Sequence, residues 1–421
     1  MSKSRFKVFN LFKEKAPKAI QEKAVGILKW GARNNFPQET IQTIYNSPTA
    51  SACMDTYIDF LEGDGITQEE IATFKVNKSQ TLDELHSQIS PDEGYLEGFA
   101  IVVKYNEFGE KIELKHLPLE SVRLGIPDDF GFISKIYYNP FYGTNEWKEI
   151  ETIVYDTYNP KKEVVLQQWA EQGSKYNGQV YYCATEKPLN RFYPLPYYQG
   201  GLKWFIIDHK IGMFHERNID NNFLLSVLFK MVGDPDEALE HDKEGNVTKT
   251  VGQAFDEFMQ NGFSGAENGG MSMALWSKLK EQMPEIQAFP SSTNHELFIA
   301  LQQLTIDNIS ITTKVPPILA NIQVAGKLGN SQEIVNSVKL MYQRVNKKQR
   351  KLERAYKELL TGFLNAPIVN ELTIRNINPV DVIPPEVWAS LTLSEQRKFI
   401  ENNYDIELEE TVVKEETTNA L

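Results

Sequence analysis

Cysteine is the scarcest residue of this chain: only Cys53 and Cys183 occur among 421 residues. They lie far apart, and neither stands in a Cys-x-x-Cys or Cys/His spacing, which argues against a disulfide scaffold and a structural zinc site. His209 and His215 lie six residues apart on a predicted helix, whereas metal ligands on one helix face usually lie three or four apart. We therefore predict no metal site and no cofactor, and a reducing cytoplasm suits the chain.

Long apolar runs are also missing. No stretch of about eighteen apolar residues exists, so no membrane-spanning helix is predicted. The segment Met1 to Phe12 has an apolar core that is too short for a signal peptide. A hydrophobic content of 41% with 24% charged residues is typical of a soluble globular protein. At 421 residues the chain is expected to form two or more domains.

Positive charge is in deficit, with 44 Lys and Arg against 57 Asp and Glu and a formal net charge of -13. Tight binding to the phosphates of DNA depends on an excess of Lys and Arg. The balance therefore argues against a protein that simply coats DNA. It does not argue against a protein through which DNA slides.

Motifs for nucleotide or hydrolytic chemistry are absent. Gly326-Lys327 is preceded by Asn321 where a Walker loop needs Gly, and followed by Leu328 where it needs Ser or Thr. The chain has no Gly-x-Ser-x-Gly elbow, no His-Glu-x-x-His and no Gly-x-Gly-x-x-Gly after a strand. Acidic pairs such as Asp128-Asp129 lie in turn-like sequence. We predict no catalytic residues and no enzyme activity.

What the chain does contain is a pair of helices around a double proline. Thr293 and Glu296 form a capping box, which predicts a helix that ends where Val315 meets Pro316-Pro317. A loop from Ile318 to Asn330 follows, relaxed by Gly326 and Gly329. A second helix then begins at the Asn330 cap. It carries apolar residues at spacings of three and four over more than about thirty residues: Ile334, Val338, Met341, Val345, Leu352, Tyr356, Leu359 and Phe363.

The second helix is strongly basic. Between 339 and 357 it carries eight cations and only one acid, Glu353. The cations are Lys339, Arg344, Lys347, Lys348, Arg350, Lys351, Arg354 and Lys357. A solvated helix face is one interpretation. The other is a surface that meets phosphates or the carboxylates of a neighbouring subunit.

The rest of the chain divides by its hydrophobic period. Ser47-Pro48 opens a helix that should reach about Leu61 and stop at Gly63. Six β-branched and aromatic runs then predict an antiparallel sheet: Phe99 to Tyr105, Ile112 to Leu117, Phe132 to Tyr138, Glu151 to Tyr158, Val164 to Trp169 and Gln179 to Ala184. A helix over 200–222 follows. After it comes an insert with, in chain order, a strand at Phe223 to Val232, an acidic stretch at Asp234 to Lys249, a short helix at Val251 to Asn261 and a strand at Met271 to Trp276.

This order of elements resembles the portal proteins of tailed double-stranded DNA bacteriophages. The points of resemblance are Asn34-Asn35-Phe36-Pro37 before the Ser47-Pro48 helix, the insert between two helices, and the loop after Val315-Pro316-Pro317-Ile318-Leu319 that ends in Gly329-Asn330-Ser331. The resemblance implies an α+β fold with an antiparallel β-rich wing, two stem helices carrying an α/β clip, a tunnel loop with a long helix, and a short helical crown.

On this resemblance the chain divides into eight segments. These are an N-terminal arm (1–33), the wing (34–199), a stem helix (200–222), the clip (223–290), a second stem helix (291–315), the tunnel loop (316–330), the long helix with the rest of the wing (331–374), and the crown with an acidic tail (375–421). The acidic tail after Asp405 is predicted to be disordered.

The resemblance also implies a function: a homo-oligomeric ring, typically of twelve subunits, at one vertex of the capsid. It would conduct double-stranded DNA during packaging and ejection, and dock terminase, the major capsid protein and head completion or adaptor proteins. It would reside in the virion, and in the host cytoplasm during assembly. The DNA-facing loop residues would be Gln323, Gly326, Lys327, Gly329 and Asn330. On the long helix we expect a subunit interface at Arg344, Lys347, Lys348, Lys351 and Arg354.

Two other classes remain open from sequence. A non-enzymatic DNA-binding scaffold would use the basic helix at 339–357 and bind DNA with a steep salt dependence. An unrecognised hydrolase would need a compact acidic pocket.

Overall fold

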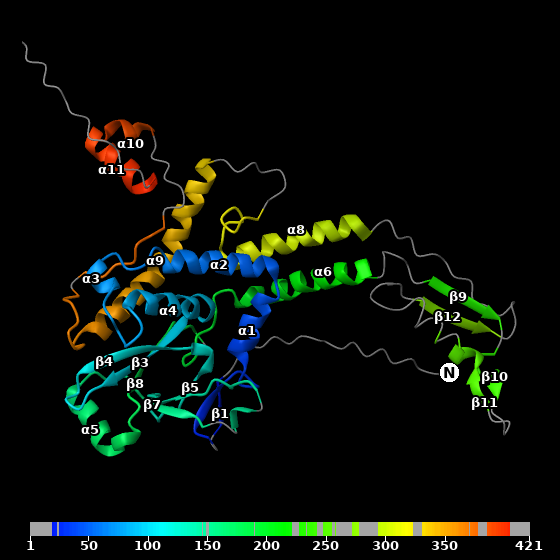
Figure 1. Ribbon diagram of the computed structural model, residues 1–421, viewed down its shortest axis with the longest axis horizontal. Coiled ribbons are helices and arrows are strands. Elements are labelled where there is room, and N and C mark those ends of the chain that lie inside the picture. Colours follow the sequence, from blue (N-terminus) through cyan, green and yellow to red (C-terminus); the bar gives the residue numbers. More distant parts are fainter. Residues whose placement is uncertain are drawn as a thin grey trace, which may run out of the picture.

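The computed structural model describes residues 19–404, apart from 23–24, 145, 149–150, 189, 221–226, 233, 242–246, 255–256, 258–271, 278–293, 323–330, 370 and 378–384. Figure 1 shows a β-rich body from which two helices run side by side to a small separate sheet. We call residues 19–201 and 331–377 the body, and residues 227–277 the insert. The chain is thus a mixed α+β protein.

A twisted six-stranded sheet forms the base of the body, in the order β4-β3-β8-β7-β6-β5. The strands are β3 (Gly98–Tyr105), β4 (Lys111–Leu117), β5 (Val122–Leu124), β6 (Lys135–Tyr138), β7 (Ile153–Thr157) and β8 (Gln179–Ala184). All neighbours pair antiparallel except β7 and β8, which pair parallel through Asp156 and Thr157. The predicted antiparallel sheet is therefore a mixed one.

Helices cover one face of this sheet. They are α1 (Phe36–Tyr45), α2 (Pro48–Glu62), α3 (Glu69–Ala72), α4 (Leu82–Leu96) and the long α9 (Ser331–Leu360). The predicted start and stop of α2 are confirmed: the Ser47 side chain accepts a hydrogen bond from Ala50 N, and Gly63 adopts φ 69° at the other end. A Cβ atom added at Gly63 would lie 2.2 Å from the Arg375 carbonyl oxygen, so only Gly fits at this position.

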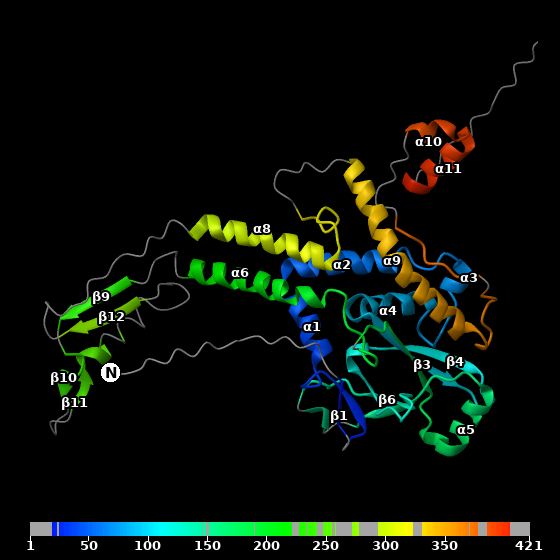
Figure 2. The same ribbon diagram turned by 180° about the vertical axis from the view of Figure 1, so that it is seen from behind.

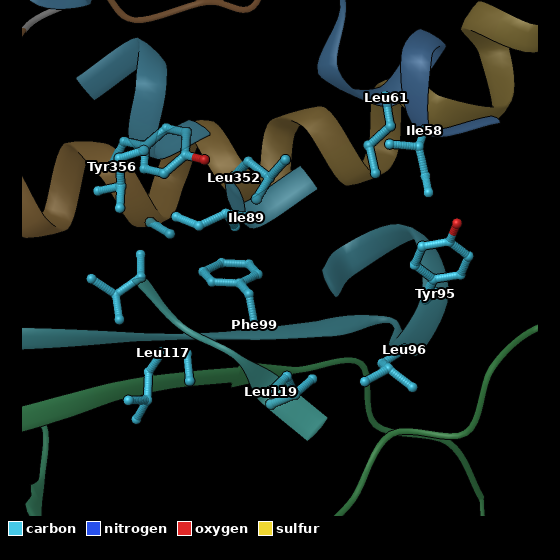
Figure 3. Packing of buried hydrophobic residues seen from close by; sticks show 14 of the residues in the cluster. Ile58, Leu61, Ile89, Tyr95, Leu96, Phe99, Leu117, Leu119, Leu352 and Tyr356 are labelled. Carbon is cyan, nitrogen blue, oxygen red and sulfur yellow. The ribbon is translucent and has the colours of Figure 1, made fainter. Parts of the chain in front are cut away.

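The core lies between α9 and the sheet. Figure 3 shows Leu352 and Tyr356 on α9 pointing toward Ile89 of α4 and Phe99 of β3. All four side chains are fully buried, so this layer ties the C-terminal helix to the first half of the chain. The predicted apolar period of α9 is confirmed up to Leu360, where the helix ends: Val338, Met341, Val345, Leu352, Tyr356 and Leu359 are buried on its inner face. Phe363 is also buried, but it lies in the turn after the helix.

A buried arginine explains the Asn34-Asn35-Phe36-Pro37 motif. Arg123 is fully buried and donates hydrogen bonds to the side-chain and main-chain oxygens of Asn34, which adopts a left-handed φ of 59°. The guanidinium lies 5.9 Å from the ring centroid of Trp30 and 4.7 Å from that of Tyr142. Burial lowers the pKa of Arg123 to about 10. Carbonyl oxygens and aromatic faces, rather than a carboxylate, thus hold the chain entering α1.

One expectation for the body is wrong, and two further features of it were not predicted. Val164 to Trp169 is not a strand but part of α5 (Lys162–Gln172), since only Val165 is buried while the Glu and Gln residues around it face solvent. The segment assigned to an N-terminal arm contributes a hairpin, β1 (Ala19–Glu22) with β2 (Ile27–Trp30), whose Trp30 is 1% exposed. The helix α4 was not predicted, although Thr81 and Glu84 form its capping box.

Beyond the body, α6 (Leu202–Asp220) and α8 (Asn294–Thr313) run together toward the insert (Figure 2). The predicted helices at 200–222 and 291–315 are confirmed. Within the described part of the insert, β9 (Val227–Val232) pairs parallel with β12 (Ser272–Ser277). The acidic stretch forms a hairpin of β10 (Ala238–His241) and β11 (Val247–Thr250), and residues 251–254 are helical.

The C-terminal part contains two short helices, α10 (Pro385–Ser390) and α11 (Leu393–Tyr404). They lie within the segment 375–421, for which the resemblance implies a short helical crown. They lie apart from the sheet, near the N-terminal end of α9 (Figure 1). The acidic tail from 405 onward lies outside the described residues.

Candidate subunit interface

The helix α9 is amphipathic, and its inner flank holds a buried ionic cluster. The ammonium of Lys351 lies 2.6 Å from Oε2 of Glu93, and that of Lys348 lies 3.7 Å from Oε1 of Glu93 and 3.4 Å from Oε1 of Glu97. The side chain of Glu93 is 0% exposed and that of Glu97 only 6%. Lys187 pairs with Glu97 at 2.6 Å and completes the cluster. We call these five residues the buried ionic cluster.

Aromatic rings surround the same cations. The ammonium of Lys348 lies 5.4 Å and 5.2 Å from the ring centroids of Tyr57 and Tyr197, and that of Lys351 lies 5.4 Å from the ring of Phe99. Burial alone would lower the pKa of Lys348, but Tyr57, Glu93 and Glu97 together raise it above its ordinary value. Lys348 therefore stays charged inside the subunit.

Two of the five predicted interface residues belong to this cluster. Lys348 and Lys351 need no carboxylates from a neighbouring subunit, because their counter-charges lie in the same chain, on α4 and at its C-terminal end. Glu93 and Glu97 were not predicted as partners, since the helix that carries Glu93 was itself not recognised. The signal that could have found this helix is the capping box of Thr81 and Glu84; Glu93 and Glu97 follow near its C-terminal end, four residues apart.

The remaining predicted interface residues are on the outside of α9. Lys347 and Arg354 are exposed, and Arg344 is partly exposed. Among the described residues none of the three has an ion pair with a carboxylate, and the same holds for exposed Lys339 and Arg350. The structure thus divides the eight cations into an internal pair and an outward-facing set.

A lysine from the sheet caps the far end of α9. The ammonium of Lys111 donates hydrogen bonds to the carbonyl oxygens of Glu358 and Thr361, both at 2.9 Å, and to Tyr158 Oη at 2.8 Å. These carbonyls lack helical partners, so a cation there also favours the helix dipole. Burial lowers the pKa of Lys111 to about 8. Lys111 has no recognisable sequence signal, because no local pattern distinguishes a lysine that caps a helix about 250 residues later in the chain.

The helix α8 buries hydroxyl side chains beside Ile309 and exposes large apolar ones. Its buried positions include Thr305, Ser310 and Thr313, whereas Leu304 is 50% and Ile311 is 72% exposed. The buried hydroxyls of Thr305 and Thr313 donate to carbonyl oxygens one turn earlier, which satisfies them inside the helix pair. Its partner α6 likewise exposes Ile206 and Met213. Exposed apolar patches are common at protein contacts.

The base of the two helices is fixed to the body. The Asp208 carboxylate on α6 accepts hydrogen bonds from the Ser47 hydroxyl at 2.6 Å and from Thr49 N at 3.1 Å, at the N-terminus of α2. A Cβ at Gly201 would lie 2.1 Å from the Thr312 side chain, so α8 packs directly on this backbone. The helix pair is therefore anchored to the body at this end.

The loop predicted to face DNA is described only in its first part. Val315 and Ala320 are buried, and Ile322 N donates to the Pro317 carbonyl at 2.9 Å. Pro316 and Pro317 end α8 as predicted, with Lys314 at a left-handed φ of 60°. The residues proposed to touch DNA lie outside the described residues: Gln323, Gly326, Lys327, Gly329 and Asn330.

Across the described ranges, no three His, Cys, Asp or Glu side chains are placed to hold a metal ion. Nor does any helix in those ranges have the length and apolar character needed to cross a bilayer.

The geometry defines a class of fold: a mixed body whose long basic helix follows a pair of helices that carry a small α/β insert. No protein-family model matches the sequence. A search of curated proteins finds no match either. Solved structures do match. The chain is similar to a chain in the "neck of native GTA particle computed with C12 symmetry", with a TM-score of 0.51 and 15% identity, over 88% of this chain and 94% of that chain.

A second match is a chain of the virion of the native gene transfer agent particle, with a TM-score of 0.50 and 15% identity, covering 86% of this chain and 92% of that one. At this identity the similarity shows the fold. The fold is thus shared, over nearly the full length of both chains, with a component of a phage-like particle that contains a neck.

Proposed function

We propose that this protein is the subunit of a portal ring in a phage or phage-like particle. The observation that carries the proposal is the shared fold over 88% of the chain with a component of a particle neck. The neck in that structure was treated with twelvefold symmetry. A ring of this chain would act as a conduit for double-stranded DNA during packaging and ejection, in the virion and, during assembly, in the host cytoplasm.

The exposed apolar side chains of α8 support the ring. Leu304 and Ile311 expose large apolar side chains, while Thr305 and Thr313 occupy the interior. Such a helix gains little from folding alone, because each buried CH₂ group is worth about 0.8 kcal/mol and these remain in water. A ring places the same surface of every subunit against the next one. The apolar faces of α6 and α8 would then be covered.

In this proposal the protein has no catalytic role. The motor that packages DNA is a separate terminase, which would dock together with head completion or adaptor proteins on the insert. The major capsid protein would surround the body. The absence of a phosphate-binding loop from the sequence supports a passive conduit.

The experiment is a measurement of assembly size for the full chain. Twelve copies of a 48.2 kDa chain give an assembly of about 580 kDa. We expect a particle of this order in sedimentation velocity or native mass spectrometry, with a central hole in negative-stain images. A chain that stays monomeric or dimeric at every concentration and salt condition would overturn the proposal.

The alternative of a DNA-binding scaffold rests on the exposed cations of α9. The helix α9 offers fewer free cations for DNA than the sequence indicates, because Lys348 and Lys351 are neutralised within the subunit. A monomer or dimer whose affinity for DNA falls steeply with salt would favour this alternative.

A further inference from the structure

The outward face of α9 carries a row of three cations. Lys347, Arg350 and Arg354 are all exposed, and their spacing of three and then four residues puts them on one side of the helix. None of them has an ion pair among the described residues. We call these three residues the basic row.

The helix α2 carries a matching row of carboxylates. Asp55 and Asp59 are exposed and Glu62 is partly exposed, at a spacing of four and then three residues. We call these three residues the acidic row. It has no cation partner among the described residues. Asp55 accepts from the Tyr95 hydroxyl at 3.4 Å and Glu62 from the Ser87 hydroxyl at 2.6 Å, so the donors are neutral.

The acidic row is unfavourable in an isolated subunit. Like charges three or four residues apart on one helix repel each other. The pKa of the Asp59 carboxyl is accordingly raised, first by partial burial and then by the charges of Asp55 and Glu62. A cationic surface laid over this face would relieve the repulsion.

The two rows do not meet within one subunit, although α2 and α9 are in contact. That contact uses other faces of both helices: the rings of Phe60 and Tyr342 lie 5.3 Å apart, and Gln349 Nε2 donates to the Phe60 carbonyl at 3.2 Å. Each subunit therefore presents two separate surfaces of opposite charge. A heterologous ring contact requires two different, complementary surfaces on one chain.

We propose that the acidic row of one subunit binds the basic row of the next subunit in the ring. The spacings match when the helices run antiparallel, so that Lys347 faces Glu62, Arg350 faces Asp59 and Arg354 faces Asp55. Each row spans eight residues, with a rise of about 10 Å between its first and last member. This inference rests on the proposed ring and names the surfaces that set its direction of assembly.

The test is a charge swap in the full chain. Arg350→Glu with Arg354→Glu on α9, and Asp55→Lys with Asp59→Lys on α2, are each expected to raise the concentration needed for half assembly by about tenfold, because like charges then face each other. Combining all four changes restores opposite charges, and assembly should return to near the parent's level. Sedimentation velocity at low and high salt measures both effects.

A control reverses two exposed charges elsewhere in the body. Glu163→Lys with Glu171→Lys on α5 changes the net charge as much as the α2 variant does, and it should leave assembly unchanged. Far-UV circular dichroism and urea unfolding show that each variant is folded. If the parent forms rings and the combined variant does not recover assembly, the pairing of the two rows is wrong while the ring stands. A parent that forms no ring refutes the proposed function itself.

Discussion

The Nζ atom of Lys351 lies 2.6 Å from Oε2 of Glu93, a carboxylate with no exposed surface. Lys351 also donates to the hydroxyl of Thr185 on the segment after β8, at 3.1 Å. One ammonium thus links α9, α4 and the sheet. This relationship separates two lysines that look alike in sequence, Lys347 and Lys351, into a surface residue and an internal one.

We predict that Lys351→Met destabilises the subunit strongly. The change leaves Glu93 buried with one cation fewer, and breaking a buried ion pair costs about 3–5 kcal/mol. Urea unfolding followed by circular dichroism measures the loss of free energy. The matched control is Lys347→Met on the same helix, where an exposed substitution should change the stability by no more than about 0.5 kcal/mol. Equal stabilities for the two variants would contradict the assignment.

Much of α9 could be predicted from the sequence alone. The double proline, the cap at Asn330 and the apolar period from Ile334 to Phe363 define a helix, and the structure confirms it over Ser331–Leu360. The partners of its cations could not be predicted in the same way. Lys347 and Lys348 are neighbours in sequence, and only the position of α4 decides which one is buried.

The errors in the body have a similar physical origin. Val164, Val165 and Leu166 are typical of a strand, yet they form α5, because local preference for a strand is weak beside tertiary packing. The parallel pairing of β7 with β8 also follows from long-range topology rather than from local pattern. Local signals thus locate the elements, and the packing between them decides the type of the short ones.

We predict that the buried His86 makes the free energy of unfolding decrease as the pH falls below about 6.5. His86 is fully buried: its Nε2 donates to the Glu62 carbonyl and its Nδ1 accepts from the Tyr356 hydroxyl, both at 2.9 Å. Burial lowers the pKa of His86 below its ordinary value. Because the unfolded chain binds this proton more readily, the neutral imidazole stabilises the fold fully above about pH 6.5, and this stability is lost as the pH falls.

The measurement is the difference in unfolding free energy between the parent and His86→Gln across pH 5 to 8. Other groups titrate alike in both proteins and cancel. Below about pH 6.5 the parent should lose up to about 1.4 kcal/mol per pH unit relative to the variant. A difference that does not change with pH would show that His86 keeps an ordinary pKa in the folded state.

We predict that the exposed apolar face of α8 matters for assembly and not for the fold. Leu304→Gln with Ile311→Gln replaces two exposed side chains that bury little in the subunit. The free energy of unfolding should change by no more than about 0.5 kcal/mol per site, whereas ring formation should weaken. Sedimentation velocity tests the second effect. The control is Ile309→Ala on the buried face, which should lower the stability by about 2–5 kcal/mol instead.

The last prediction concerns the loop between α8 and α9. Its first residues are fixed, since Ala320 is buried and Ile322 N bonds to the Pro317 carbonyl, and α9 begins at Ser331. We predict that this loop faces the channel of the proposed ring. Lys327 is the only charged residue between Ile318 and Asn330, so each subunit offers a single cation to the DNA. Since each neutralised phosphate adds to a salt-dependent attraction, one weak contact per subunit suits DNA that must slide.

Deletion of Gln323 to Leu328 should therefore leave ring formation intact and impair packaging or retention of DNA. Ring size is measured by sedimentation, and packaged DNA by its protection from nuclease in assembled heads. Lys327→Ala serves as the matched variant: it removes the cation and keeps the length of the loop, so it should reduce retention less than the deletion does. The hypothesis of a buried connecting loop predicts the opposite result, because removing six residues from a packed segment would prevent the ring from forming. Full packaging by the deletion variant would show that the loop makes no functional contact with DNA.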